Sequence, residues 1–275
     1  ATSASDRNRV HCRTGGRSGN PVPVAGMSIF SKFAWVSRLD RRIYVGAAAV
    51  GLVLLAWFLW TWITWPDVSA LQTGDPETTA FIERYREARR EAGENEAVAW
   101  TPVPYDRISP NLARAVISSE DTEFFFHDGF SSHELGEAIR KAIRERKKPR
   151  GASTMSQQLV KNLWLSPSRS LTRKLREAML TRQMERSLSK ERILELYLNV
   201  VEFGPGVYGA EAAAQHYFGK PAARLTLREG AMLAAGLPRP RTWNPSSGSE
   251  NYARRVDQIL EIESQLEFLD RYLGP

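Results

Sequence analysis

The chain has 275 residues, of which 42% are hydrophobic and 25% are charged. This composition excludes a wholly disordered or low-complexity protein, and the length is sufficient for one large domain or two small ones. The single cysteine, Cys12, excludes a disulfide scaffold and a zinc site built on several thiolates. The four histidines show no HxxxH spacing, so the sequence lacks that metal-binding motif.

Most of the positive charge lies at the N-terminal end. The whole chain has a net charge of +7. Residues 1–65 contain eight basic and two acidic residues, a net charge of +6, which leaves +1 for residues 66–275. A nucleic-acid-binding domain carries its excess positive charge in the folded part of the chain. We therefore expect no nucleic-acid partner.

The first 26 residues are polar and rich in Gly, Ser, Arg and Pro, and we expect them to be disordered. We expect Met27 to be the natural start of the protein and residues 1–26 to be an upstream extension.

The segment from 43 to 65 contains no charged residue and is long enough to span a bilayer as a helix. Its C-terminal end holds four of the eight tryptophans, as in the aromatic belt at a membrane surface. Arg38, Arg41 and Arg42 precede it, so the positive-inside rule places residues 1–42 in the cytoplasm. We expect 43–65 to be a transmembrane helix and 66–275 to be a periplasmic domain. The alternative is a cleaved signal peptide, whose apolar stretch is shorter, at about 7–15 residues.

The part of the chain after residue 66 is predicted to be mainly α. Helices are expected at 76–92, at 132–147 and at 170–186, the last with Leu171, Leu175 and Met179 on its apolar stripe. Further helices begin where Ser109, Ser189 and Thr226 act as N-caps. No long stretch alternates between polar and apolar residues as a sheet strand does.

Glu120 and Asp121 end an apolar helix and precede three phenylalanines. Burial beside apolar side chains raises a carboxyl pKa and suits it to proton transfer near neutral pH. The alternative interpretation is a solvated turn beside a buried cluster of phenylalanines.

The segment GASTMSQQLVKN, residues 151–162, follows a basic cluster and enters a helix. Its hydroxyl and backbone N–H groups could hold an anion, and Lys161 would add a positive charge. The alternative is a capped helix start after a solvated run of charge.

Arg173 and Lys174 lie four and three residues before Glu177, so the three share one helical face. They are either a functional cluster or ordinary surface ion pairs. Two separated glutamates suit chemistry at a sugar carbon, and clustered cations suit a phosphate leaving group. The combination therefore favours glycosyl transfer from a phosphate-activated sugar over plain glycoside hydrolysis.

At these residues the sequence resembles the peptidoglycan glycosyltransferases, glycosyltransferase family 51. EDTEFFFHDG resembles the family motif EDxxFxxHxG, and GASTMSQQLVKN resembles GxSTxxQQLxKN. RKLREAMLTRQME and KERILELYLNVVEFG resemble the two motifs that follow, and the match runs in order from about 105 to 245. Within the family the chain resembles the monofunctional biosynthetic transglycosylases, and we expect no transpeptidase domain.

The resemblance implies a lysozyme-like helical glycosyltransferase fold and lipid II as the substrate. Carried over residue by residue, it makes Glu120 the general base of an inverting transfer that forms β-1,4-linked glycan strands and releases undecaprenyl diphosphate. Glu177 matches the second essential glutamate. The remaining matches lie on the diphosphate or donor side: Ser153, Gln157, Lys161, Arg169, Arg173 and Lys174.

The resemblance also implies an enzyme that crosses the bacterial inner membrane once. Its partners would be lipid II, the growing glycan strand, the lipid bilayer and other proteins of cell-wall synthesis or division. A divalent cation, Mg²⁺ or Mn²⁺, could assist the diphosphate, and the sequence identifies no metal ligand. Two alternatives stay open: a lytic transglycosylase or lysozyme-type hydrolase, and a catalytically inactive membrane-anchored scaffold.

Overall fold

The computed structural model describes residues 41–131, 136, 140, 144, 153–166, 168 and 170–273. The predicted disordered segment 1–26 and most of the predicted helix 132–147 lie outside the described residues, as does Arg169. The chain divides into two compact units, and the boundary falls between Trp65 and Pro66.

In the first unit, the described residues form one long helix, α1 (Arg41–Ile63). Its apolar stretch, Ile43–Ile63, has 21 residues with a mean hydropathy of 2.1. At about 1.5 Å per residue, this length matches the hydrocarbon thickness of a bilayer. The structure therefore confirms the predicted apolar helix, which is long enough to cross a membrane.

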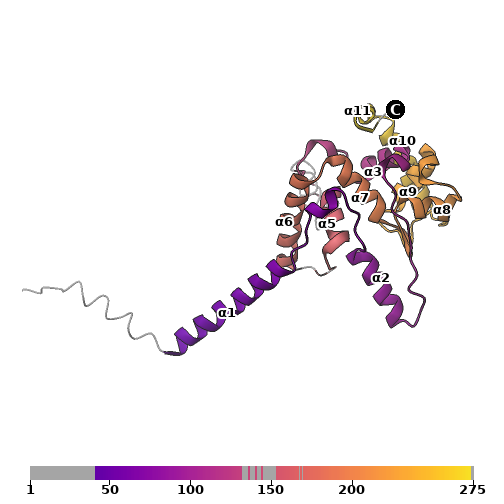
Figure 1. The fold of residues 1–275 in the computed structure, drawn as a ribbon. Coiled ribbons are helices and arrows are strands. Elements are labelled where there is room, and N and C mark those ends of the chain that lie inside the picture. Colours follow the sequence, from indigo (N-terminus) through magenta and orange to yellow (C-terminus); the bar gives the residue numbers. More distant parts are fainter. Residues whose placement is uncertain are drawn as a thin grey trace, which may run out of the picture. The chain divides into compact units, whose positions relative to one another are not determined.

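The second unit is mostly α-helical, as predicted (Figure 1). Its longer helices are α2 (Ala80–Glu91), α3 (Pro110–Glu120), α5 (Met155–Trp164), α6 (Leu171–Ser187), α7 (Lys190–Val200), α8 (Ala210–Phe218), α9 (Leu227–Gly236) and α10 (Glu250–Glu263). Shorter helical turns are η3 (Ser69–Gln72), η4 (Tyr105–Arg107), η5 (Phe124–Phe126), η6 (Ala222–Arg224), η7 (Glu267–Leu269) and α11 (Asp270–Leu273).

The sequence did not predict a small sheet, of which two strands lie between α7 and α8 in the chain and the third lies between α2 and α3. It has the strand order β1 (Ala99–Trp100), β3 (Val207–Tyr208), β2 (Glu202–Gly204). β1 is parallel to β3, and β2 is antiparallel to β3. Strands of two or three residues are too short for alternation of side chains to be recognised in a sequence.

Serine and threonine caps fix where the helices begin. The predicted caps Ser109 and Ser189 accept hydrogen bonds from the backbone of Asn111 and Arg192. Thr226 and Glu229 form the predicted capping box of α9, in which each side chain bonds to the other residue's backbone N–H. These caps satisfy helix N–H groups that otherwise have no partner.

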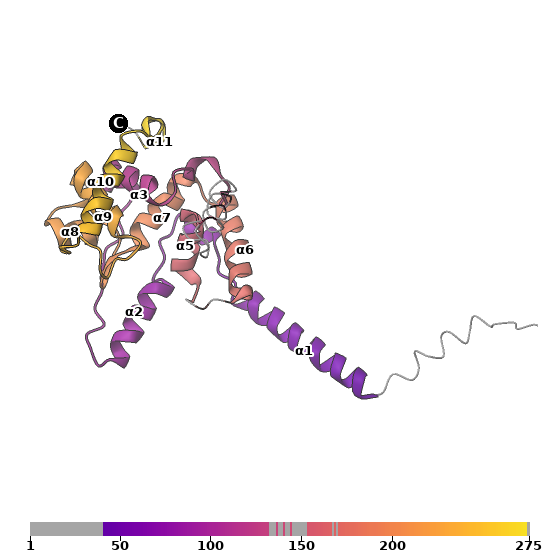
Figure 2. The same ribbon diagram turned by 180° about the vertical axis from the view of Figure 1, so that it is seen from behind.

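Two groups of helices make up the core of the second unit. α3 packs on α9 and α10, while α5 packs on α6 and α7. Figures 1 and 2 show α7 between α5 and α6 on one side and α3, α9 and α10 on the other. Gly230 allows α9 to approach α3 closely, because a Cβ there would lie 2.8 Å from the Asn111 carbonyl oxygen of α3. The C-terminal end of α3 is joined to the start of α5 by side-chain contacts, and the candidate site lies there.

Helix α6 exposes the stripe that the sequence predicts as its apolar face. Leu171, Leu175 and Met179 are 90%, 59% and 52% exposed. The buried residues of α6 are Glu177, Leu180, Thr181 and Met184. Apolar periodicity therefore gave the helix correctly but not the face that packs on the rest of the second unit.

Candidate active site

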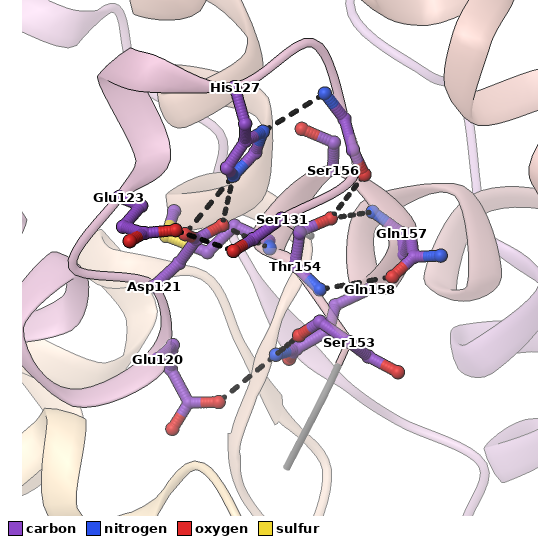
Figure 3. Close-up of polar contacts among 12 residues, drawn as sticks. Glu120, Asp121, Glu123, His127, Ser131, Ser153, Thr154, Ser156, Gln157 and Gln158 are labelled. Carbon is purple, nitrogen blue, oxygen red and sulfur yellow. Dashed lines mark hydrogen bonds and ion pairs between the residues drawn. The ribbon is translucent and has the colours of Figure 1, made fainter. Parts of the chain in front are cut away.

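Glu120 is the last residue of α3, and its side chain is only 12% exposed. Gln158 Nε2 of α5 donates a hydrogen bond to Glu120 Oε2 at 3.1 Å (Figure 3). Ser119 Oγ donates to Glu120 Oε1 at 3.1 Å. Burial raises the pKa of Glu120 above its usual value, because desolvation penalises the charged form; the two hydrogen bonds partly oppose this. The sequence interpretation of a carboxyl with a raised pKa is thus supported for Glu120.

Asp121 lies next to Glu120 but has a different role. Its carboxylate accepts hydrogen bonds from the Met155 backbone N–H at 2.8 Å and from His127 Nε2 at 3.0 Å. His127 Nδ1 accepts from the Gly129 backbone N–H, so the proton that His127 shares with Asp121 is on Nε2. Figure 3 shows Asp121 directed toward His127, and Glu120 directed toward Gln158. Asp121 is fully used in joining α3, the following loop and α5.

In the first turn of α5, the adjacent residues Gln157 and Gln158 have different hydrogen-bond partners. Thr154 and Gln157 form a capping box, in which Gln157 Oε1 accepts from the Thr154 backbone N–H at 3.1 Å. Gln157, predicted to line the donor side, is therefore engaged with its own helix. Gln158 instead reaches Glu120, and Tyr197 Oη of α7 donates to Gln158 Oε1 at 3.0 Å. Ser153, also predicted for the donor side, is exposed just before the helix.

Glu177 is buried on α6, and both of its carboxylate oxygens are paired with cations. Arg173 Nη1 lies 2.7 Å from Oε2, and Lys174 Nζ contacts Oε1. The Glu177 side chain is 4% exposed, so these pairs differ from the surface ion pairs that the alternative interpretation expected. The predicted group of Arg173, Lys174 and Glu177 is thus one cluster.

Lys161 of α5 links the two glutamates electrostatically. Burial lowers the pKa of Lys161, whereas the negative charges of Glu177 and Glu120 raise it and the positive charge of Arg173 lowers it further. One lysine therefore interacts electrostatically with both glutamates. Of the predicted residues, Arg169 is the one that lies outside the described part of the chain.

Four residues around Glu120 were not predicted. Ser119 and Gln158 bond to its carboxylate, Arg255 lies 3.6 Å from Oε1, and Tyr197 bonds to Gln158. The spacing of Thr154 and Gln157 is that of a capping box, so it could have assigned Gln157 to the cap and left Gln158 for the site. Tyr197 lies within the segment KERILELYLNVVEFG, but nothing local to that segment indicates that it reaches Gln158, and Arg255 is distant in sequence from Glu120.

No group of three or more His, Cys, Asp or Glu side chains with metal-binding geometry occurs among the described residues. Both oxygens of Glu177 are also taken by Arg173 and Lys174. The described residues therefore do not form a metal site of their own.

Comparisons with known proteins show the family of this chain. The family model described as Transglycosylase matches residues 87–263. Similar proteins include the biosynthetic peptidoglycan transglycosylases of Azoarcus sp. (strain BH72) and Thiobacillus denitrificans, each 45% identical. The alignments cover 77% and 76% of this chain and 90% and 89% of the relatives. The relative of the same name from Chromobacterium violaceum is 40% identical over 84% of this chain and 99% of its own length. The chain belongs to the transglycosylase family and is a glycosyltransferase of peptidoglycan synthesis.

Proposed function

We propose that the protein polymerises lipid II into β-1,4-linked glycan strands with release of undecaprenyl diphosphate. The observation that carries the proposal is the position of Lys161 within range of both Glu120 and Glu177. It supports a site that combines a desolvated carboxyl group with a cluster of cations, as transfer of a sugar from a diphosphate requires.

Glu120 is the proposed general base. Its carboxylate takes the proton of the 4-hydroxyl group of the acceptor N-acetylglucosamine, and that oxygen attacks C1 of the donor N-acetylmuramic acid. The bond between C1 and the diphosphate oxygen breaks with inversion, so an α-linked donor gives a β-linked product. The raised pKa of Glu120 makes it a stronger base than an exposed glutamate.

The cations stabilise the diphosphate as it leaves. Lys161, Arg173 and Lys174 are the proposed ligands of its oxygens, with Ser153 and Gln157 on the same side. Arg169 remains a proposed ligand from the sequence alone. Glu177 holds Arg173 and Lys174 in position through its two paired oxygens. A divalent cation, Mg²⁺ or Mn²⁺, would arrive on the diphosphate rather than on a protein site.

The apolar helix α1 supports a location in the bacterial inner membrane. We propose that the chain crosses this membrane once and that residues 66–275 lie in the periplasm. Lipid II diffuses in the same membrane, so an anchored enzyme meets its substrate without a search through bulk solvent. Other proteins of cell-wall synthesis or division are the proposed protein partners.

The test is polymerisation of lipid II by the full-length chain in detergent. Glu120→Gln should reduce the rate by about 100-fold or more, because an amide cannot accept the proton. Glu261→Gln is the matched control, since Glu261 is exposed on α10 and should leave the rate unchanged.

Full activity of Glu120→Gln would refute the assignment of the base. Release of muropeptides from purified cell walls, with no polymer from lipid II, would show a hydrolase instead. Absence of any turnover by the wild-type chain would favour a scaffold.

A further inference from the structure

Arg255 of α10 also reaches the carboxyl group of Glu120, from the C-terminal part of the chain. Arg255 Nη2 donates a hydrogen bond to Ser119 Oγ at 2.9 Å and lies 3.6 Å from Glu120 Oε1. Ser119 Oγ in turn donates to the same Oε1 atom at 3.1 Å. The guanidinium therefore acts on Glu120 both directly, by charge, and through the Ser119 hydroxyl.

Helix α10 is held firmly against α3, so this contact is not that of a mobile surface arginine. Glu263, near the other end of α10, forms an ion pair with Arg114 of α3, with 2.6 Å between Oε1 and Nε. Tyr252 Oη donates to the Met232 carbonyl oxygen of α9 at 2.7 Å. Val256 and Ile259 are buried. Arg255 is only 29% exposed, which agrees with a fixed position.

The groups that face Glu120 come from three further helices. Gln158 and Lys161 lie on α5, Tyr197 lies on α7, and Arg255 lies on α10. Two of these carry a positive charge, Lys161 and Arg255. Lys161 also interacts with Glu177 and is assigned to the diphosphate side. The proposed reaction therefore gives Lys161 a role but gives none to Arg255.

We propose that Arg255 is a positioning residue for the transfer: it orients the Glu120 carboxylate through Ser119 and keeps it ionised and ready to accept a proton. This inference rests on the proposed function. The 3.6 Å separation suits the role, because it favours the charged form while the lone pairs of the carboxylate stay available. A close ion pair with both oxygens would use those lone pairs.

Removal of the Arg255 charge should change how the transfer rate depends on pH. The positive charge of Arg255 lowers the pKa of Glu120, against the larger raising effect of burial. Loss of that charge raises the pKa of Glu120, so more of the base is protonated at low pH. The acid limb of the pH–rate profile should then move to higher pH, with recovery at alkaline pH.

The experiment compares Arg255→Gln with wild type in lipid II polymerisation from pH 5.5 to pH 9, using the full-length chain in detergent. The expected result is a rate about 10-fold lower near pH 6, a smaller loss near pH 9, and an acid limb at higher pH. Arg254→Gln is the matched control, because Arg254 is exposed and bonds to Asn251 on its own helix. Arg254→Gln should match wild type throughout.

Arg255→Lys keeps the charge and should restore the position of the acid limb. A pH–rate profile of Arg255→Gln that equals the wild-type profile would overturn the inference. A rate lowered by the same factor at every pH would also overturn it and would show that the role of Arg255 is structural. If Arg255→Gln does not fold, Ser119→Ala carries the test and should also move the acid limb to higher pH. If the wild type polymerises lipid II and the acid limb of the variants does not move, this inference alone is overturned. If the wild type does not polymerise lipid II, the proposed function is overturned as well.

Discussion

Replacement of Asp121 by alanine tests whether this acid is structural while its neighbour Glu120 is chemical. The Asp121 side chain has no exposed surface and accepts hydrogen bonds from His127 Nε2 and from the Met155 backbone N–H. Asp121→Ala leaves both donors without a partner in the interior. Each unsatisfied buried donor costs about 1–3 kcal/mol, so the expected loss is about 4 kcal/mol of unfolding free energy.

For a domain of about 200 residues, 1 kcal/mol corresponds to about 2–4 °C, so the midpoint of thermal unfolding should fall by about 10 °C. The assay is thermal unfolding of the full-length chain in detergent, followed by circular dichroism. Asp128→Ala is the control, because Asp128 is exposed in the same loop and should change the midpoint little. Asp121→Asn should show an intermediate loss, since its oxygen serves one donor while its NH₂ faces the other.

An unchanged midpoint in Asp121→Ala would refute this reasoning. Loss of polymerisation together with an unchanged midpoint would assign Asp121 to the chemistry instead.

Two further predictions concern Gly129 and Lys161. Gly129 has φ +90°, and a Cβ there would lie 2.7 Å from Thr181 Cγ2. Gly129→Ala should therefore destabilise the fold by about 3 kcal/mol through strain and overlap, measured by thermal unfolding. Gly93→Ala, at φ +68° with no atom within 4 Å, should cost only about 1 kcal/mol; equal losses would contradict the overlap. Lys161→Ala should lower the rate of lipid II polymerisation by about 100-fold, while Lys161→Arg retains more of it. A Lys161→Ala variant as active as wild type would remove this lysine from the diphosphate side.

The parts of the site that could be predicted are those fixed by short stretches of sequence. Ser109, Thr226 and Glu229 mark helix starts by a local rule, and all three act as predicted. Arg173, Lys174 and Glu177 meet because residues three and four apart share a helical face. Such contacts depend on one helix alone, so the sequence contains all the information they need.

The parts that could not be predicted depend on packing between distant segments. Arg255 reaches Glu120 only because α10 packs on α3, and the two residues are far apart in the chain. Tyr197 contacts Gln158 only because α7 packs on α5. The exposed stripe of α6 is a related case, since an apolar stripe does not reveal what will cover it. The sequence alone did not indicate how the helices are oriented relative to one another, and these contacts depend on that orientation.

The different surroundings of the two glutamates support the proposal that Glu120, rather than Glu177, is the base. Both are largely buried, at 12% and 4% exposure of the side chain. Glu177 gives one oxygen to Arg173 and the other to Lys174, so two cations at hydrogen-bond distance neutralise its negative charge. Glu120 meets neutral donors, Gln158 and Ser119, at hydrogen-bond distance, and its contact with Arg255 is longer. A proton acceptor needs a carboxylate that is desolvated but not neutralised, and the surroundings of Glu120 fit that condition better than those of Glu177, which supports the proposal that Glu120 is the base.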